Sequence, residues 1–294
     1  MPLSLQLHTA RLDLLRSTHA AGAALTRAAV HPRKAKMDMI RWKREGGPPP
    51  LPPMGQITAA LGPVEPDQPR WQAGAPPGEI QHTWIGHATF LLQLNGLNIL
   101  TDPQFSARCS PVSFIGPKRV LPPASTVEQL PRIDAVLISH NHYDHLDHST
   151  VQTLASRPGG DRTIWFVPHG LKAWFTNENI QQVVELQWWE EAELGGGRLR
   201  CMFTPAKHWT KRGLMDDMTS LWGSWAVYQP GSAAGEPAPL SVWFSGDTGK
   251  ATPCGPRDSV FEVCSRRREF CHSAAAPSTF SRSVNRDGEG ASAK

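Results

Sequence analysis

The chain has 294 residues, which is enough for one large domain or two small ones with a buried core. Its net charge of +4 is modest and gives no argument for a nucleic-acid partner. The five cysteines are odd in number and contain no close C-x-x-C pair, which argues against a disulfide framework and favours a reducing, intracellular compartment. No apolar run is long enough to span a bilayer, so any membrane contact would be peripheral.

Residues 1–79 form a basic, proline-rich arm that we expect to be mostly disordered. Six Arg and Lys residues lie in its first 36 positions, against a single acidic residue, Asp13. This composition also permits an organelle transit peptide, so cytoplasmic, peripheral-membrane and organelle locations all stay open. The run PPPLPP at 48–53 cannot lie inside a helix and predicts a stiff, extended linker.

A folded domain is predicted over residues 80–249, and it opens with three strands. Residues 81–92 alternate and then become apolar, which predicts two strands joined by a turn. The dipeptide Asn95-Gly96 is a hairpin signal, and it leads into a third strand. Strands joined by such short turns favour an antiparallel sheet. His87, in the first turn, has two open interpretations, a place near a metal site or a structural role.

The motif SHNHYDHLD, at residues 139–147, carries the strongest chemical signal. It follows an apolar run, 133–138, that predicts a short buried strand, and it presents His140, His142, Asp144 and His145 within six positions. Imidazole nitrogens and carboxylate oxygens are ligands that suit zinc and related metals. Histidines two apart on an extended chain can point to one side, and a turn after them could aim Asp144 and His145 at a second metal. Exposed histidines without a role are the alternative, which this order of ligand types after a buried strand disfavours.

Beyond the motif, the pattern predicts strands and helices in alternation. Helices are expected at 149–156 and 170–177, and strands at 163–168, 183–186, 198–205, 221–228 and 241–245. His208 follows the end of one of these strands, where a third imidazole could complete the first metal site. Asp247 lies in GDTG after the last strand, and its flanking glycines would let the backbone approach two metals closely.

The order HNHYDH, then His208, then GDTG resembles the metallo-β-lactamase superfamily. The stretches TDP (101–103), GPKR (116–119), WWEE (188–191), LMDD (214–217) and WGSW (222–225) are similar to the N-acylphosphatidylethanolamine-hydrolysing phospholipase D family and its bacterial relatives. The resemblance covers about residues 80–250.

This resemblance implies an α+β fold of the αββα sandwich type with two zinc ions. His140, His142 and His208 would bind one zinc, Asp144 and His145 the other, and Asp247 would bridge them. A metal-bound hydroxide, oriented by Asp144 as the catalytic residue, would release N-acylethanolamine and phosphatidic acid from a phospholipid. In that family the enzyme meets its substrate at a membrane surface, often as a homodimer.

The sequence departs from the family after Gly249. The family continues through a second set of strands and helices that supplies a further histidine, whereas residues 250–294 predict an unrelated, disordered tail in which His272 is not a ligand. We therefore expect an incomplete sandwich that holds one zinc firmly, with impaired activity. Two alternatives are a non-catalytic, truncated metal-binding product and another hydrolase of the superfamily, such as a lactonase or a nuclease.

Overall fold

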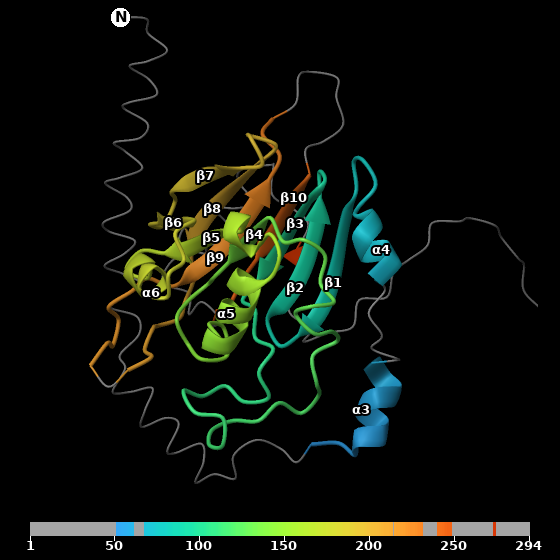
Figure 1. The fold of residues 1–294 in the computed structure, drawn as a ribbon, viewed down its shortest axis with the longest axis vertical. Helices are drawn as coiled ribbons and strands as arrows, with labels where there is room; N and C mark the ends of the chain where they lie inside the picture. The colour runs from blue at the N-terminus through green and yellow to red at the C-terminus, as the bar shows by residue number, and fades with distance from the viewer. Residues whose placement is uncertain (1–50, 62–67, 214, 232–239, 249–272, 275–294) are drawn as a thin grey trace, which may run out of the picture.

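The computed structural model describes residues 51–61, 68–213, 215–231, 240–248 and 273–274. The basic segment 1–50 and the predicted tail, apart from 273–274, lie outside the described residues. The described chain forms two β-sheets that face each other, with helices beside the first of them (Figure 1).

The first sheet has six strands in the order β1-β2-β3-β4-β5-β6. These strands are β1 (Ile80–Gly86), β2 (Thr89–Leu94), β3 (Leu97–Thr101), β4 (Ala135–Leu137), β5 (Ile164–Pro168) and β6 (Val183–Leu186). The first three pair antiparallel, which confirms the predicted meander, and β3 to β6 pair parallel. Because parallel neighbours end at the same edge, the segment that follows β4 emerges beside the end of β3.

The second sheet has five strands in the order β11-β10-β9-β8-β7. They are β7 (Glu191–Leu194), β8 (Leu199–Pro205), β9 (Gly223–Tyr228), β10 (Ser241–Phe244) and β11 (Ser273–Ala274). The sequence did not predict β7, whose two glutamates weaken the strand pattern, nor β11, which lies within the expected tail and pairs parallel with β10. The tail thus contributes at least two residues to the second sheet.

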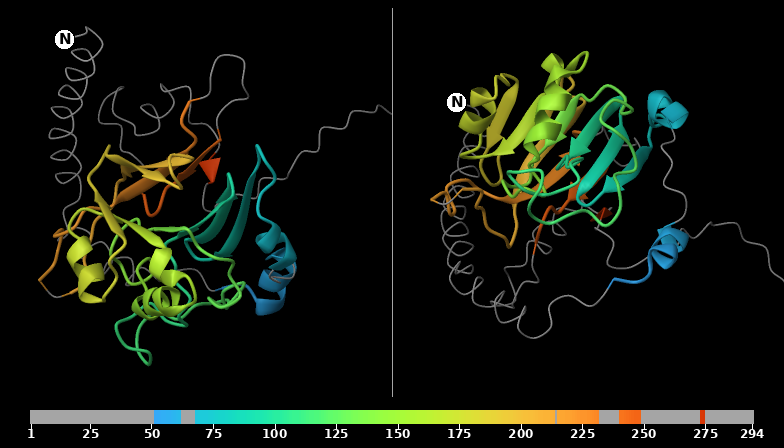
Figure 2. Two further views of the ribbon diagram at one scale, coloured as in Figure 1. Left: turned by 45° about the horizontal axis from the view of Figure 1, so that its top comes forward. Right: turned by 60° about the horizontal axis from the view of Figure 1, so that its bottom comes forward.

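The helices are short: α3 (Met54–Leu61), α4 (Gln68–Ala73), α5 (His148–Ser156) and α6 (Lys172–Asn177), with a 3-10 turn η1 (Gly160–Arg162). Helices α5 and α6 lie against the outer face of the first sheet (Figure 2). Val151, Leu154 and Phe175 pack there on alternate strand residues such as Val136. Trp71 of α4 joins the same cluster, so packing begins before the predicted domain start at Ile80.

The main core lies between the two sheets. Leu92 and Phe166 of the first sheet share one buried cluster with Phe203, Trp225 and Val227 of the second. Since strand side chains alternate between faces, each strand of the first sheet supplies one set to this core and the other set to the helices. Two facing sheets, with helices on the outer face of the first, agree with the predicted sandwich in the described part of the chain.

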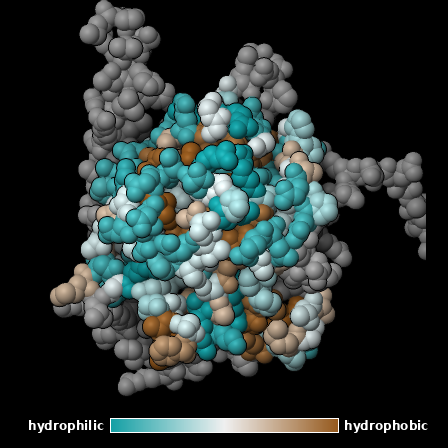
Figure 3. All heavy atoms as spheres, viewed as in Figure 1, coloured by the Kyte–Doolittle hydropathy of each residue, from teal (hydrophilic) through white to brown (hydrophobic). Residues whose placement is uncertain are grey.

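A long connection between β3 and β4 carries exposed apolar side chains. Phe114 and Ile115 are 74% and 61% exposed, and Val112 and Val120 are also exposed. Figure 3 shows that the visible face is mostly hydrophilic, with hydrophobic groups scattered over it and gathered toward its lower edge. None of the helices in the described part of the chain has the length and apolar character required to cross a membrane.

Candidate metal centre

The predicted motif folds as a loop at the end of β4. The backbone N–H groups of His145 and Leu146 donate to the carbonyl of His142, at 3.1 and 2.8 Å, which closes a turn after the first two histidines. Arg212 stabilises this loop through two hydrogen bonds. Its Nη1 donates to the carbonyls of Asn141 and Leu146 at 3.2 and 2.7 Å. The turn therefore directs His140 and His142 to one position and the following residues to another.

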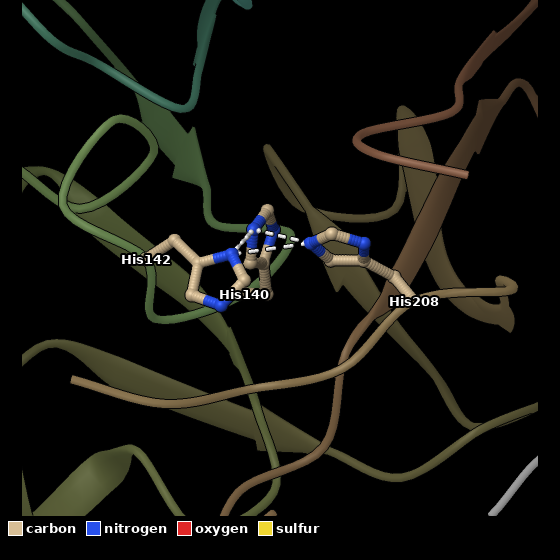
Figure 4. A group of neighbouring side chains, drawn as sticks. All are labelled: His140, His142 and His208. Atoms are coloured by element: carbon tan, nitrogen blue, oxygen red, sulfur yellow. Dashed lines mark hydrogen bonds between the residues drawn. The ribbon is translucent and has the colours of Figure 1, made fainter. Parts of the chain in front are cut away.

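Three imidazole nitrogens converge at the first position (Figure 4). His140 Nε2 lies 2.8 Å from His142 Nδ1, and His208 Nε2 lies 3.1 Å from each of them. His208 arrives from the other sheet, just after β8, as the sequence predicted for a third imidazole. Ligands at zinc–nitrogen distances of about 2.0–2.1 Å in a tetrahedron are separated by about 3.3 Å, so this spacing fits one metal ion.

A second group, with more carboxylates, lies beside the first. His145 Nε2 is 3.7 Å from Asp144 Oδ2 and 3.3 Å from Asp247 Oδ1. The other carboxylate oxygen of Asp247 lies 3.6 Å from His208 Nε2. Asp247 thus faces both groups, which is the position that the predicted bridge requires. The structure brings all six sequence-predicted site residues together.

Asp102, at the end of β3, orients two of these histidines. Its buried carboxylate accepts a hydrogen bond from His145 Nδ1 at 2.6 Å and two from Ser139, through the backbone N–H at 2.7 Å and Oγ at 2.5 Å. Ser139 Oγ in turn lies 2.9 Å from His140 Nδ1. A partner on Nδ1 leaves Nε2 free to face a metal, so Asp102 selects the tautomer that a ligand histidine needs.

A glycine allows the second sheet to approach the motif. A Cβ on Gly246 would lie 2.6 Å from the Cβ of Ser139, and its φ of +54° is in the left-handed region. Glycine is therefore required next to Asp247, as the sequence pattern suggested. The close approach carries Asp247 to the end of β4.

The electrostatics of the two groups differ. Burial lowers the pKa values of His140, His142 and His208, to about 4 for His208, so these imidazoles are neutral at pH 7, as metal ligands must be. Burial would also lower the pKa of His145, but the carboxylates of Asp102 and Asp247 outweigh it and raise that pKa to about 10. Without a metal, His145 therefore carries an additional proton at pH 7. The carboxylates around it favour a positive charge, which a metal cation would also supply.

The residues present fit a metal ion. His145 Nε2 is fully buried and makes no hydrogen bond of acceptable geometry within the described chain, although it faces two carboxylates. A buried polar atom without a partner is costly, and a metal bound to Nε2 would satisfy it. Imidazole and carboxylate donors in this number are typical of zinc and related first-row ions.

The stability of the metal-free protein should depend on pH through His208. The pKa of His208 is about 6.5 in the unfolded chain and about 4 in the folded chain. Between pH 4 and 6.5 the unfolded chain therefore binds more protons than the folded chain. We expect His208 to contribute a fall in the free energy of unfolding of about 1.4 kcal/mol for each pH unit as pH is lowered from 6.5 toward 4. His140 and His142, whose pKa values are also lowered, add to the same fall. His145, whose folded pKa is about 10, is protonated in both states once the pH is well below 6.5, so its contribution is constant in that part of the range. Denaturant titrations with a chelator at several pH values measure the slope, and a slope that His208→Asn leaves unchanged would contradict this origin.

Two cavities lie around the centre. The smaller, about 150 Å³, is lined by His87, Asp247, Phe90 and Phe244 and opens directly on the second group. The larger, about 480 Å³, contains none of the six predicted site residues and lies beyond Tyr143, along Trp174 and Arg212. The smaller cavity therefore connects the second group with the solvent, whereas the larger one lies farther from the six residues.

His87 is the residue whose place the sequence left open. The structure puts its Nε2 3.1 Å from Asp144 Oδ2, with its ring 5.2 Å from the ring of His145. It lies in the turn between β1 and β2, 57 positions before Asp144. The only signal in the sequence is a histidine at a turn after a strand, which many structural histidines share.

Several known proteins are similar to this chain in sequence. The chain is 41% identical over 174 residues to N-acyl-phosphatidylethanolamine-hydrolyzing phospholipase D 1 of Caenorhabditis elegans, covering 57% of this chain and 46% of that protein. It is 36% identical over 172 residues to the mitochondrial N-acyl-phosphatidylethanolamine-hydrolyzing phospholipase D of Saccharomyces cerevisiae, covering 58% and 34%. The chain thus spans less than half the length of these curated relatives.

Among solved structures, the metallo hydrolase Igni18 of Ignicoccus hospitalis aligns at 22% identity and a TM-score of 0.43, covering 59% of this chain and 63% of that one. The family model for the beta-lactamase superfamily domain matches residues 97–262, more than half of the chain and beyond the predicted limit at Gly249. The chain belongs to the beta-lactamase superfamily.

Proposed function

We propose that this chain is a zinc-dependent phosphodiesterase that hydrolyses an N-acylphosphatidylethanolamine to N-acylethanolamine and phosphatidic acid. The observation that carries the proposal is the convergence of His140, His142 and His208 on one point beside Asp247. The similarity to phospholipases of that specificity supports the choice of substrate.

The chain's own residues would hold and direct the reactants. A bound metal ion would supply a nucleophile at neutral pH by acidifying water. Asp144, one of the carboxylates of the second group, would orient that water and accept its hydrogen bond. Hydrolysis forms a bond from the water oxygen to phosphorus and breaks the bond from phosphorus to the ethanolamine oxygen, which takes up a proton as it leaves. Asp247, which faces both groups, would hold the ligands of the two groups at a fixed separation.

The connection between β3 and β4 supports contact with a lipid surface. Phe114 and Ile115 are exposed, and the same loop carries Arg108 and Lys118. Exposed apolar groups beside cations are typical of segments that rest on an anionic bilayer without crossing it. The larger cavity is lined by Arg108 of this loop. A lipid that leaves the bilayer would therefore enter the protein through this cavity.

The proposal predicts phospholipid turnover that depends on His140. Zinc-loaded protein is incubated with vesicles containing N-acylphosphatidylethanolamine, and N-acylethanolamine is measured by mass spectrometry. His140→Ala removes one of three converging nitrogens, so we expect kcat/KM to fall by about 1000-fold or more. The matched control is His82→Ala, an exposed histidine on β1, for which turnover should be unchanged.

Each alternative has its own outcome. A zinc-loaded, folded chain that cleaves a lactone, an ester or RNA but no phospholipid would make it another hydrolase of the superfamily. A zinc-loaded, folded chain without turnover of any of these substrates would make it a non-catalytic metal-binding protein.

A further inference from the structure

The second group of the centre has an incomplete ligand set if only the six predicted residues are counted. Asp144, His145 and Asp247 supply three donors, whereas a closed zinc site commonly has four. We infer that His87 is a further protein ligand, so that His87, Asp144, His145 and Asp247 together hold a second metal ion. This inference deepens the proposed metal centre, replaces the expectation that only one zinc is held firmly, and does not depend on which substrate is hydrolysed.

The distances within the group fit a metal ion. His87, Asp144 and His145 each offer one ligand atom, and these three atoms lie within 4.8 Å of one another. His87 Nε2 to Asp144 Oδ2 is 3.1 Å, and the two contacts of His145 Nε2 with carboxylate oxygens are 3.3 and 3.7 Å. These values bracket the separation of about 3.3 Å between ligands of a tetrahedral zinc.

An independent observation points to the same place. His145 Nε2 is fully buried and without a hydrogen bond within the described residues, and it faces the space between Asp144 and Asp247. Its other nitrogen is already used by Asp102. His87 does not serve as the partner of this buried nitrogen, because the two rings meet edge to face with centroids 5.2 Å apart. A metal ion between them would satisfy both imidazoles.

The turn that carries His87 is held in place. Its backbone has a φ of +52°, which is uncommon for a residue with a side chain, and its carbonyl accepts a hydrogen bond from Trp84 Nε1 at 2.9 Å. The next carbonyl, of Ala88, accepts from Thr101 Oγ1 at 2.9 Å. Thr101 immediately precedes Asp102, so one strand end fixes both the His87 turn and the partner of His145. A ligand fixed in this way loses little conformational entropy on binding.

A route for the ion exists on the same side. The His87 side chain is 46% exposed, and it lines the 150 Å³ cavity together with Asp247. The carboxylates of Asp144 and Asp247 supply negative charge to the group. A cation can therefore reach the group from solvent and find its charge balanced there.

The test measures metal bound to the full chain. Purified protein is loaded with zinc or cobalt(II), and metal per chain and the affinity of each step are determined, with the visible spectrum of the cobalt form. We expect two ions in the wild type and one in His87→Gln, with the second affinity lowered by about 100-fold or more. Glutamine can still donate a hydrogen bond toward Asp144 but is a poor zinc ligand, so this variant separates ligation from mere positioning.

His87→Cys provides the complementary result. A thiolate is a good ligand for both metals, so this variant should retain the second ion and show sulfur-to-cobalt charge-transfer absorption. His82→Ala is the matched control and should bind two ions. Retention of the first ion, on His140, His142 and His208, reports that each variant is folded.

Three results would overturn the inference: one ion in the wild type, full second-site affinity in His87→Gln, or no thiolate band in the cobalt form of His87→Cys. If the glutamine variant fails to fold, the cysteine spectrum decides. Metal content and phospholipid turnover are separate readouts, so a chain with two ions and no turnover would leave His87 as a ligand and refute only the proposed substrate.

Discussion

Replacing Trp225 with alanine is expected to lower the free energy of unfolding by about 3–5 kcal/mol. The side chain is fully buried between the two sheets, against Phe203 and Phe166 with ring centroids 4.8 and 6.1 Å away. Its Nε1 donates to the carbonyl of Ile138 at 2.9 Å, directly before the histidine motif. The substitution would open a cavity in the core and remove a hydrogen bond that holds the end of β4. Denaturant unfolding of the metal-free protein measures the change.

Two companion variants separate these contributions. Trp225→Phe keeps an aromatic ring but removes the N–H donor, and about 1–2 kcal/mol should be lost. Trp174→Ala truncates a half-buried tryptophan of α6 and should cost less than half of the Trp225→Ala effect. A loss below about 1 kcal/mol for Trp225→Ala would contradict the packing of the sheets through this residue.

Replacing Asp102 with asparagine is expected to weaken metal binding by about 10- to 100-fold, mainly at the second group. An asparagine amide that keeps its oxygen toward Ser139 presents its NH2 to His145, which also donates from Nδ1. The imidazole would then move its proton to Nε2, the atom that faces the metal, and lose its ability to ligate. Competition with a coloured chelator measures the affinities of the two steps.

Asp102→Ala and a surface control complete this experiment. Alanine would leave the buried imidazole of His145 and the N–H of Ser139 without an acceptor, and a loss of about 3–5 kcal/mol in unfolding free energy is expected. Asp161→Asn changes an exposed carboxylate in η1 and should affect neither metal affinity nor stability. Unchanged affinity in Asp102→Asn would show that His145 does not depend on this carboxylate for its orientation.

Much of the centre could be predicted because its residues follow strand ends. The apolar run before His140, the strand before His208 and the glycines around Asp247 each identify a point where a sheet ends. The resemblance to a known superfamily then specified which of these points meet. In the structure the six side chains lie together, and Asp102, at the end of the third strand, contacts His145 directly.

Other features depend on contacts that no local pattern encodes. His87 comes near Asp144 because β2 pairs with β3 and β3 pairs with β4, and the local sequence of its turn carries no distinguishing signal of this. Trp71 packs on the first sheet although its short helix lies in a stretch whose composition predicted disorder. Strand β7 forms because β8 offers it a paired edge, which overrides the weak strand preference of its glutamates.

The candidate ligands enter the centre from both sheets. The motif that contains His140 follows a strand of the first sheet, whereas His208 and Asp247 follow strands of the second. An ion held by all of them would act as a cross-link that closes loops of many residues, in the way a disulfide does. The two halves of the sandwich could then separate only after the ion departs. The lifetime of the folded chain against proteases would accordingly be governed by the rate of metal release rather than by the equilibrium stability of the core.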